Sequence, residues 1–309
     1  MNQTSTICIL MGTYNGQAFL AEQLLSIENQ SHKDWCLVIS DDGSTDDTLA
    51  IAKTFQEKWG KDRLEIRQGP KQGFCANFLS LACDPTIKAD FYAFADQDDI
   101  WLVDKLSIAL AYFNNEYNAG IPRVYCGRTQ IVDENLNHLG YSSLFALPLS
   151  FRNALVQSIA GANTMVFNQG AKELLEKAGL LRVVSHDWWL YQITQGVGGE
   201  VYYDPMSTLL YRQHSNIIAG SSLHVTQKLN RVMRLLKGEF KEWNALNYQA
   251  LSSVSQLFTN ENQLLLESYG HFRTANFIRG YLLFKVCGLY RQTLAGNIAL
   301  WLAVLINKV

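Results

Sequence analysis

Short apolar runs alternate with amphipathic segments over the first hundred residues of the chain. An apolar run bounded by turn residues predicts a buried strand, and apolar positions that recur every three to four residues predict a helix. The predicted strands span residues 7–11, 35–39, 63–67 and 91–95. The helices predicted between them are residues 17–28, a segment that begins at Ser44 or Thr45, and residues 74–83. Strands separated by helices predict an α/β protein with a mostly parallel, Rossmann-like sheet and right-handed crossovers.

The alternation weakens after residue 100, although both kinds of element continue. The predicted elements are a helix from Leu102 to about Asn115, strands at 124–127 and 162–167, a helix at 169–177, and short strands at 201–203 and 208–211. From Leu223 onward the pattern is helical, with one apolar face. We therefore divide the chain into a domain of residues 1–220, with halves of about 1–100 and 101–220, and a helical C-terminal region of residues 221–309.

Polar residues follow four of the predicted strands, and ligands of parallel sheets bind beyond the carboxyl ends of the strands. These polar segments are Thr13-Tyr14-Asn15, Asp41-Asp42, Gln68 to Lys71 and Asp96-Gln97-Asp98. Three carboxylates lie within Asp96–Asp99, and hard oxygen ligands there suit Mg2+ or Mn2+, which in turn can hold a diphosphate. An acidic turn that caps the helix starting near Leu102 is the alternative. Neither a G-x-G-x-x-G nor a Walker A motif follows the first strand, so a nicotinamide or P-loop site loses its main support.

The balance of charge differs between the two ends of the chain. Residues 221–309 hold ten Lys or Arg and four Glu, a net charge of +6, so residues 1–220 carry −8 of the total of −2. An acidic first part and a basic tail argue against a nucleic-acid-binding protein, and they suit a catalytic domain whose tail is drawn to anionic lipid. A hydrophobic content of 48% and a charged content of 17% are typical of a folded protein.

The cysteines and the apolar runs predict where the protein is located. The six cysteines form no C-x-x-C pair, so we expect reduced, buried thiols in the cytoplasm. The polar residues 1–6 lack the features of a secretory signal. The longest apolar run near the end, Ile298–Ile306, has nine residues, well short of the ~20 of a spanning helix. Residues 268–309 contain five Lys or Arg and no acid, which predicts interfacial helices; packing against the catalytic domain or a second subunit is the alternative.

Four motifs stand in order along the chain. They are Thr13-Tyr14-Asn15-Gly16, Asp41-Asp42-Gly43-Ser44-Thr45-Asp46, Asp96-Gln97-Asp98-Asp99 and His186-Asp187-Trp188-Trp189. With these motifs, residues 5–220 resemble glycosyltransferase family 2, the inverting nucleotide-sugar transferases of GT-A fold. The last motif, together with Tyr211-Arg212-Gln213-His214, looks like the bacterial rhamnosyltransferases that assemble surface polysaccharides. The resemblance implies a nucleotide-sugar half of about residues 1–100 and an acceptor half of about residues 101–220.

The resemblance also implies a nucleotide pocket at the first two strands. Thr13, Tyr14 and Asn15 would line this pocket. Asp42 would accept a hydrogen bond from the ring N–H of a uracil or thymine, and Asp41 is its rival for that bond.

The remaining acids take the chemical roles that the resemblance implies. Asp96 would face the ribose, and Asp98 would bind the metal as in the family's D-x-D motif. Asp187 looks like the general base that deprotonates the acceptor hydroxyl. The chemistry agrees, because a departing diphosphate needs a cation or basic side chains against it and an attacking hydroxyl must lose a proton. One displacement inverts the anomeric centre without a covalent intermediate.

Further residues have two competing interpretations each. Arg212 and Lys71 would contact the diphosphate, or they are ordinary surface and loop residues. His214 would be a further metal ligand or a phosphate contact, or it is a structural histidine. The acceptor site would use aromatic rings as an apolar platform under a sugar, although core packing is the alternative for these rings. The predicted acceptor residues are Trp101, His186, Trp188 and Trp189.

The sequence therefore predicts a metal-assisted, inverting glycosyltransferase of surface polysaccharide synthesis. The favoured donor is dTDP-L-rhamnose, with a UDP-sugar next, and the acceptor is a glycan or a polyprenyl-linked sugar at the inner face of the cell membrane. Two alternatives remain: a nucleotidyltransferase that acts on a sugar phosphate, and a non-catalytic carbohydrate-binding protein. No nucleic-acid partner is expected, and the sequence is compatible with an oligomer.

Overall fold

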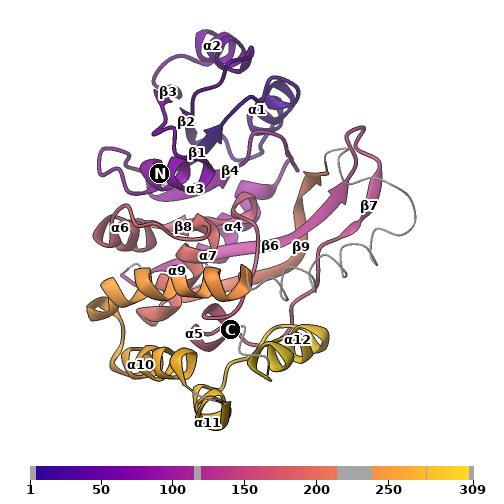
Figure 1. Cartoon of the computed structure of the whole chain (residues 1–309). Helices are drawn as coiled ribbons and strands as arrows, with labels where there is room; N and C mark the ends of the chain where they lie inside the picture. Colours follow the sequence, from indigo (N-terminus) through magenta and orange to yellow (C-terminus); the bar gives the residue numbers. More distant parts are fainter. Residues whose placement is uncertain (1–4, 115–119, 214–238, 276, 306–309) are drawn as a thin grey trace. The chain divides into compact units, whose positions relative to one another are not determined.

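The structure of the chain, a computed structural model, describes residues 5–114, 120–213, 239–275 and 277–305, and it forms two compact units (Figure 1). The sheet unit comprises the described parts of Met1–Leu144, Ala160–Leu180 and Glu200–Gln213. The helical unit comprises the described parts of Phe145–Ile159, Leu181–Gly199 and His214–Val309. The helical unit thus takes two segments from the first 220 residues, so no single point of the chain divides the units.

The strands of the sheet unit form one nine-stranded sheet. Its parallel part has the spatial order β3-β2-β1-β4. These strands are β1 (Ile7–Thr13), β2 (Trp35–Asp41), β3 (Leu64–Gln68) and β4 (Phe91–Ala95). The sheet continues with both parallel and antiparallel pairs through β8 (Val166–Asn168), β6 (Arg123–Val132), β9 (Glu200–Arg212) and β5 (Ile100–Trp101), while β7 (His138–Tyr141) pairs with β6. The α/β prediction is confirmed: strands β1 to β4 are parallel to one another, and β6 and β9 form a further parallel pair in the second half of the chain.

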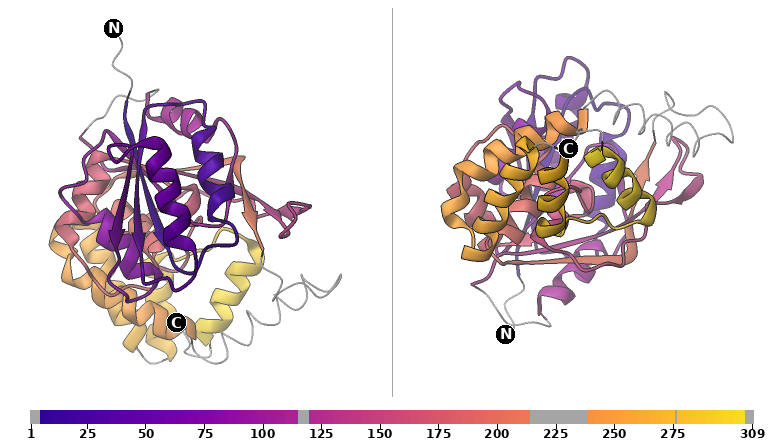
Figure 2. Two further views of the ribbon diagram at one scale, coloured as in Figure 1. Left: turned by 90° about the horizontal axis from the view of Figure 1, so that it is seen from above. Right: turned by 60° about the horizontal axis from the view of Figure 1, so that its bottom comes forward.

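Apolar side chains are buried on both faces of β1, β2 and β4, which explains the nearly continuous apolar sequence of these three strands. The helices of the sheet unit, seen from two further sides in Figure 2, are α1 (Leu20–Glu28), α2 (Thr48–Trp59), α3 (Phe74–Ala82), α4 (Lys105–Asn114) and α6 (Gln169–Ala178). Ile7 and Met11 of β1 share a core cluster with Leu24 of α1. On α3, the ring of Phe78 meets that of Phe94 on β4 at 5.6 Å between centroids.

Strand β9 joins the two short strands that were predicted at residues 201–203 and 208–211. Gly127 of β6 pairs with Asp204, and Arg128 pairs with Ser207, so Pro205 and Met206 form a bulge in the ladder. A proline is tolerated in a bulge because no ladder partner needs its missing N–H. The two predicted strands are therefore one strand of 13 residues.

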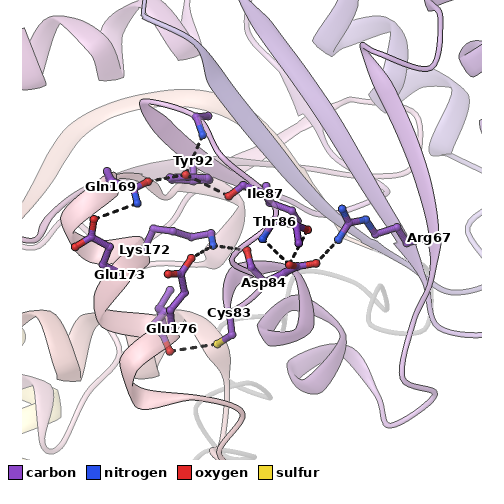
Figure 3. Close-up of polar contacts among 12 residues, drawn as sticks. Arg67, Cys83, Asp84, Thr86, Ile87, Tyr92, Gln169, Lys172, Glu173 and Glu176 are labelled. Atoms are coloured by element: carbon purple, nitrogen blue, oxygen red, sulfur yellow. Dashed lines mark hydrogen bonds and ion pairs between the residues drawn. The ribbon is translucent and has the colours of Figure 1, made fainter.

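A polar network joins α6 to the chain between α3 and β4 (Figure 3). The fully buried Lys172 donates from Nζ to the carbonyl of Asp84 at 2.8 Å and to the carboxylate of Glu176 at 2.5 Å. The side chain of Asp84 also forms an ion pair with Arg67. Because each buried charge has a partner, the network fixes α6 against the sheet without an uncompensated charge.

The helical unit holds all the described helices of the C-terminal region. Its helices are α5 (Phe151–Ala154), α7 (His186–Gly196), α9 (Glu239–Ser253), α10 (Asn260–Thr274), α11 (Phe277–Cys287) and α12 (Leu294–Leu305). The side-chain oxygen of Asn247 on α9 accepts the backbone N–H of Val184 at 3.0 Å, which joins α9 to the turn before α7. Among the described residues, no helix combines the length and the apolar character needed to cross a membrane.

Candidate active site

The carboxyl ends of β1, β2 and β4 bring three of the four polar segments to one edge of the sheet. Thr13 is the register partner of Asp41, and Met11 is the partner of Ala95, so β4 ends directly before Asp96. The fourth segment begins at Gln68, the partner of Asp41 on β3. Together these segments form what we call the donor edge: residues 13–17, 41–48, 68–73 and 96–99.

The carboxylate of Asp41 holds its own loop. It is buried, and it accepts the hydroxyl of Thr13 at 3.0 Å, the hydroxyl of Ser44 at 2.5 Å and the backbone N–H groups of Gly43 and Ser44. A carboxylate with four donors has little capacity left for a ligand. Asp41 therefore stabilises the fold of its loop and is less suited than Asp42 to accept a ring N–H of a base.

Asn15 and its neighbours join the loop after β1 to the loop after β2. Asn15 has a left-handed backbone with φ of 48°, which an asparagine tolerates better than most residues. Its backbone N–H donates to the hydroxyl of Ser44 at 2.8 Å, and its side-chain oxygen accepts the N–H of Thr45 at 2.9 Å. The N–H of Gly16 donates to the hydroxyl of Thr48 at 2.7 Å. The residues from Ser44 to Thr48 therefore hold the loop after β1 in place by hydrogen bonds.

Asp42 orders the loop that carries Lys71. One carboxylate oxygen accepts the N–H of Lys71 at 2.6 Å, and the other accepts the N–H of Gly73 at 2.8 Å. Lys71 is exposed and has a φ of 58°. Each oxygen of Asp42 receives one bond here and can accept another, so Asp42 remains able to meet a ring N–H.

Gln97 connects the acidic loop to the loop after β1, a function that the sequence did not reveal. Its side-chain oxygen accepts the N–H of Tyr14 at 2.9 Å, and its side-chain nitrogen donates to the carbonyl of Tyr14 at 3.0 Å. A Cβ at residue 16 would lie 2.3 Å from that same oxygen, so the Gln97 side chain can take this position only beside a glycine. The ring of Tyr14 is 58% exposed at this point.

Arg212 supports the acidic loop from inside the sheet unit. Its side chain is buried and donates to the carbonyl of Asp98 at 3.0 Å, the carbonyl of Glu134 at 2.5 Å and the carboxylate of Glu22 at 2.5 Å. The guanidinium also lies 4.4 Å from the ring centroid of Phe19. Because the guanidinium is buried against these protein groups, a positioning role for Asp98 is favoured over the predicted diphosphate contact.

The side chain of Asp99 is buried. It does not cap the helix expected near Leu102, so the alternative of a capping turn is wrong for this residue. It accepts the side-chain N–H of Asn163 at 2.5 Å and the backbone N–H of Arg212. Helix α4 begins later, at Lys105, because Ile100–Trp101 forms β5. Burial, and then the negative charge of Asp98, raise the pKa of Asp99 to about 7.

A buried lysine accompanies this buried carboxylate. The side chain of Lys105 is fully buried, and burial lowers its pKa to about 7 while the charge of Asp99 opposes that change. Its Nζ has no hydrogen-bond partner among the described residues and lies 4.9 Å from the ring centroid of Trp101. Each of the two groups therefore favours the charged form of the other.

Replacing Lys105 by Met is expected to destabilise the protein by about 3 kcal/mol, because one charge of a buried pair then lacks its partner. The double variant Asp99→Asn/Lys105→Met should recover most of that loss. Urea unfolding followed by tryptophan fluorescence measures both. Lys58→Met, which removes a surface ion pair with Glu28, is the matched control and should cost less than about 1 kcal/mol. A double variant no more stable than Lys105→Met would contradict the charge pairing.

Tyr211 interacts with the acidic loop of the donor edge, although the sequence assigned it no role beyond its place in a motif. It lies on β9 and is 38% exposed. Burial, and then the carboxylates of Asp99, Asp96 and Asp98, raise the pKa of Tyr211 to about 12. The phenol thus keeps its proton at neutral pH and can donate it as a hydrogen bond.

Asp187 lies in the helical unit, in the first turn of α7. Its surface is partly exposed, yet desolvation raises its pKa, while a hydrogen bond from Ser185 and the N–H of Trp188 act in the opposite direction. A raised pKa makes a carboxylate a stronger base. The local environment of Asp187 is therefore suited to accepting a proton.

The predicted aromatic platform is not found, because the three tryptophans are buried. Trp101 belongs to the core cluster of the sheet unit. In the helical unit, Trp188 donates from its ring nitrogen to the carbonyl of Ala154 at 2.7 Å, and Trp189 is fully buried. His186 is buried too, and burial lowers its pKa to about 3, so the ring is neutral. These four residues are packed inside their own units and offer no surface to a sugar.

The residues available for a metal are few. Within residues 5–114, 120–213, 239–275 and 277–305, no three His, Cys, Asp or Glu side chains are grouped to hold an ion. His214 lies outside the described residues. Asp96 and Asp98 nevertheless fit Mg2+ or Mn2+, because such ions often use one or two carboxylates and take their other ligands from substrate phosphates.

The arrangement of the sheet defines the structural class of the protein, the GT-A fold. The structure is similar to Staphylococcus aureus TarS 1–349 in complex with UDP-GlcNAc, with a TM-score of 0.52 and 17% identity over 71% of this chain and 60% of that one. It is also similar to the mannosyltransferase PcManGT from Pyrobaculum calidifontis in complex with GDP-Man and Mn2+. That TM-score is 0.53, with 15% identity over 99% of this chain and 86% of that one. At such identities the likeness concerns the fold alone.

The sequence comparisons identify the family. Residues 8–175 match Glycosyl transferase family 2. The dTDP-rhamnosyl transferase RfbG of Shigella flexneri is 31% identical over 231 residues, which cover 72% of this chain and 78% of that protein. The putative glycosyltransferase EpsE of Bacillus subtilis is 35% identical over 112 residues, covering 36% of this chain and 40% of that protein. The chain therefore belongs to glycosyl transferase family 2 and is a glycosyltransferase.

Proposed function

We propose that the protein transfers a sugar, with inversion, from a nucleoside diphosphate sugar to a glycan or lipid-linked acceptor. The observation that carries the proposal is the support of Asp98 at the donor edge. Arg212 donates to the carbonyl of Asp98, and Gln97, the residue before Asp98, bonds to the backbone of Tyr14. A carboxylate that must hold a diphosphate through a cation needs such fixed geometry, because small displacements reduce rates strongly.

The nucleoside is proposed to bind against the first two loops of the donor edge. Thr13 and Asn15 shape the pocket, and the exposed ring of Tyr14 offers a flat apolar face to the base. Asp42 is preferred over Asp41 for the ring N–H, since Asp41 already receives four donors.

The diphosphate and ribose are proposed to lie next to Asp96 and Asp98. Asp96 accepts from the ribose hydroxyls, and Asp98 is the main protein ligand of Mg2+ or Mn2+. When bound, the cation stabilises the charge that develops on the leaving diphosphate. Lys71, on the loop ordered by Asp42, supplies positive charge to the same group.

Asp187 is proposed to be the general base. Its raised pKa strengthens it as a proton acceptor, and the side chain keeps a partly exposed surface through which a hydroxyl can approach. Taking the proton of the acceptor hydroxyl allows one displacement at the anomeric carbon, which inverts its configuration.

The donor is proposed to be dTDP-L-rhamnose, with UDP-sugars as the next choice. Support comes from the relative RfbG, which is named a dTDP-rhamnosyl transferase and matches over 72% of this chain. The acceptor is proposed to be a glycan or polyprenyl-linked sugar of surface polysaccharide synthesis, with the enzyme held peripherally at the inner face of the cell membrane.

A panel of nucleotide sugars, with and without Mn2+, tests the proposal by release of nucleoside diphosphate. We expect release from dTDP-L-rhamnose that depends on the metal and is accelerated by an acceptor. Release of pyrophosphate from a nucleoside triphosphate and a sugar phosphate would instead indicate a nucleotidyltransferase. Binding of a glycan with no product in either assay would indicate a carbohydrate-binding protein.

A further inference from the structure

The outer face of α12 is a continuous apolar stripe. Helix periodicity puts positions three, four, seven, eight and eleven residues apart on one face, and the exposed apolar residues of α12 follow that spacing. With their exposed fractions they are Leu294 (79%), Ile298 (53%), Trp301 (38%), Leu302 (51%) and Leu305 (48%). The opposite face, with Leu300 and Ala303, is buried in the helical unit. No residue of α12 is charged, so nothing on this helix interrupts the stripe.

Helix α11 extends the apolar surface and supplies positive charge beside it. The ring of Trp301 lies 4.6 Å from that of Phe284 and 5.8 Å from that of Tyr281, measured between centroids. The Nζ of Lys285 lies 4.8 Å from the centroid of Tyr281. Leu282 and Val286, on the same helix, are 58% and 67% exposed. Lys285 and Tyr281 of α11 therefore lie next to the stripe, beside its residue Trp301.

A second basic residue lies at the start of α12. The backbone N–H of Arg291 donates to the side-chain oxygen of Asn297 at 2.8 Å, and the side chain of Asn297 donates back to the carbonyl of Arg291 at 2.7 Å. The side chain of Arg291 is partly exposed, with its guanidinium 5.5 Å from the ring centroid of Phe240, and Arg279 on α11 is exposed. Between residues 268 and 305 the chain has four basic residues and no acid. The segment that carries α11 and α12 therefore has charges of one sign.

We propose that α12 inserts its apolar stripe into the interface of an anionic lipid bilayer, with Lys285, Arg279 and Arg291 against the headgroups. At 12 residues the helix is about 18 Å long, too short for the ~30 Å hydrocarbon core, so it lies in the membrane plane. Trp and Tyr favour the level of the headgroups, and Lys and Arg side chains extend toward water there. The charge complementarity favours anionic lipid over a second copy, whose matching stripe would carry the same positive charges.

This inference rests on the proposed peripheral membrane contact and names the surface that makes it. The test is flotation of the full chain with vesicles of phosphatidylcholine alone or mixed with phosphatidylglycerol. We expect flotation with the mixed vesicles. Leu302→Asp should weaken binding about tenfold or more, because an apolar side chain is lost and a repelled charge is added. Arg279→Glu/Lys285→Glu should weaken binding to the mixed vesicles at least roughly fivefold.

Leu180→Asp is the matched control, since Leu180 is an exposed leucine (69%) of the sheet unit. This variant should float like the original chain. Release of nucleoside diphosphate with a water-soluble acceptor should be unchanged in all the variants, so loss of lipid binding and failure of the proposed reaction give different results.

Three results would overturn the inference. The first is flotation of Leu302→Asp at the level of the original chain, or no flotation of the original chain. The second is a lowered melting temperature of Leu302→Asp, which would mean that the stripe is covered by the chain itself. The third is a dimer in sedimentation velocity that Ile298→Asp dissociates, which would assign the stripe to a second copy.

Discussion

Replacing Asp187 by Asn is expected to abolish glycosyl transfer while nucleotide affinity stays nearly intact. Asparagine keeps the size of the side chain but cannot accept a proton, and general-base catalysis contributes about 10²–10⁴ to a rate. The donor edge lies in the sheet unit and Asp187 in the helical unit, so the nucleotide pocket keeps its own residues. Turnover by nucleoside diphosphate release and affinity by titration calorimetry measure the two effects.

The matched control for this variant is Glu261→Gln. Glu261 is an exposed acid in the first turn of α10, in the same unit and with the same relation to a helix N-terminus. It should turn over normally. In the original enzyme kcat/KM should fall as the pH is lowered through the pKa of Asp187, which burial raises above the ordinary aspartate value. Near-normal turnover of Asp187→Asn would remove Asp187 from the role of base.

Replacing Asp98 by Ala is expected to remove the metal-dependent part of nucleotide binding. The carboxylate is the main proposed ligand of the cation, and the cation is the link to the diphosphate. Because even residues that only support a ligand cost 10–100-fold in metal affinity, we expect a loss of at least about 100-fold. Calorimetry with dTDP, with and without Mn2+, gives the difference.

Asp62→Ala is the control for the Asp98 variant, since Asp62 is an exposed aspartate in the turn before β3. It should bind dTDP and Mn2+ like the original chain. An Asp98→Ala variant whose nucleotide binding still responds to Mn2+ as before would rule out Asp98 as the metal ligand.

Strands β1, β2 and β4 could be predicted because each is a mostly apolar run between polar turns. Strands β1, β2 and β4 begin at the predicted residues Ile7, Trp35 and Phe91. Strand β5 could not be predicted, since two residues carry no periodicity and its formation depends on pairing with the distant β9. The same applies to the bulge at Pro205, which the partner strand accommodates.

The acidic residues of the candidate site could be predicted from the sequence, whereas the residues that hold their loops in place could not. Asp98 and Asp187 could be identified from motifs, and their roles remain predictions. Gln97 lay unnoticed between two aspartates, because its function depends on the loop after β1 coming close in space. Trp101 was predicted to contact a sugar because the sequence does not show whether an aromatic residue beside an acidic motif is exposed or packed in the core. In the structure it is packed in the core.

The reciprocal bonds between Gln97 and Tyr14 have a thermodynamic consequence for the donor. Together with the bonds from Asn15 and Asp42, they fix the donor edge before any ligand binds. The conformational entropy of these loops is lost during folding, so the nucleotide need not order them when it binds. A change of donor specificity should then come from exchanging single exposed side chains such as Tyr14, because a grafted loop would lose the partners that hold it.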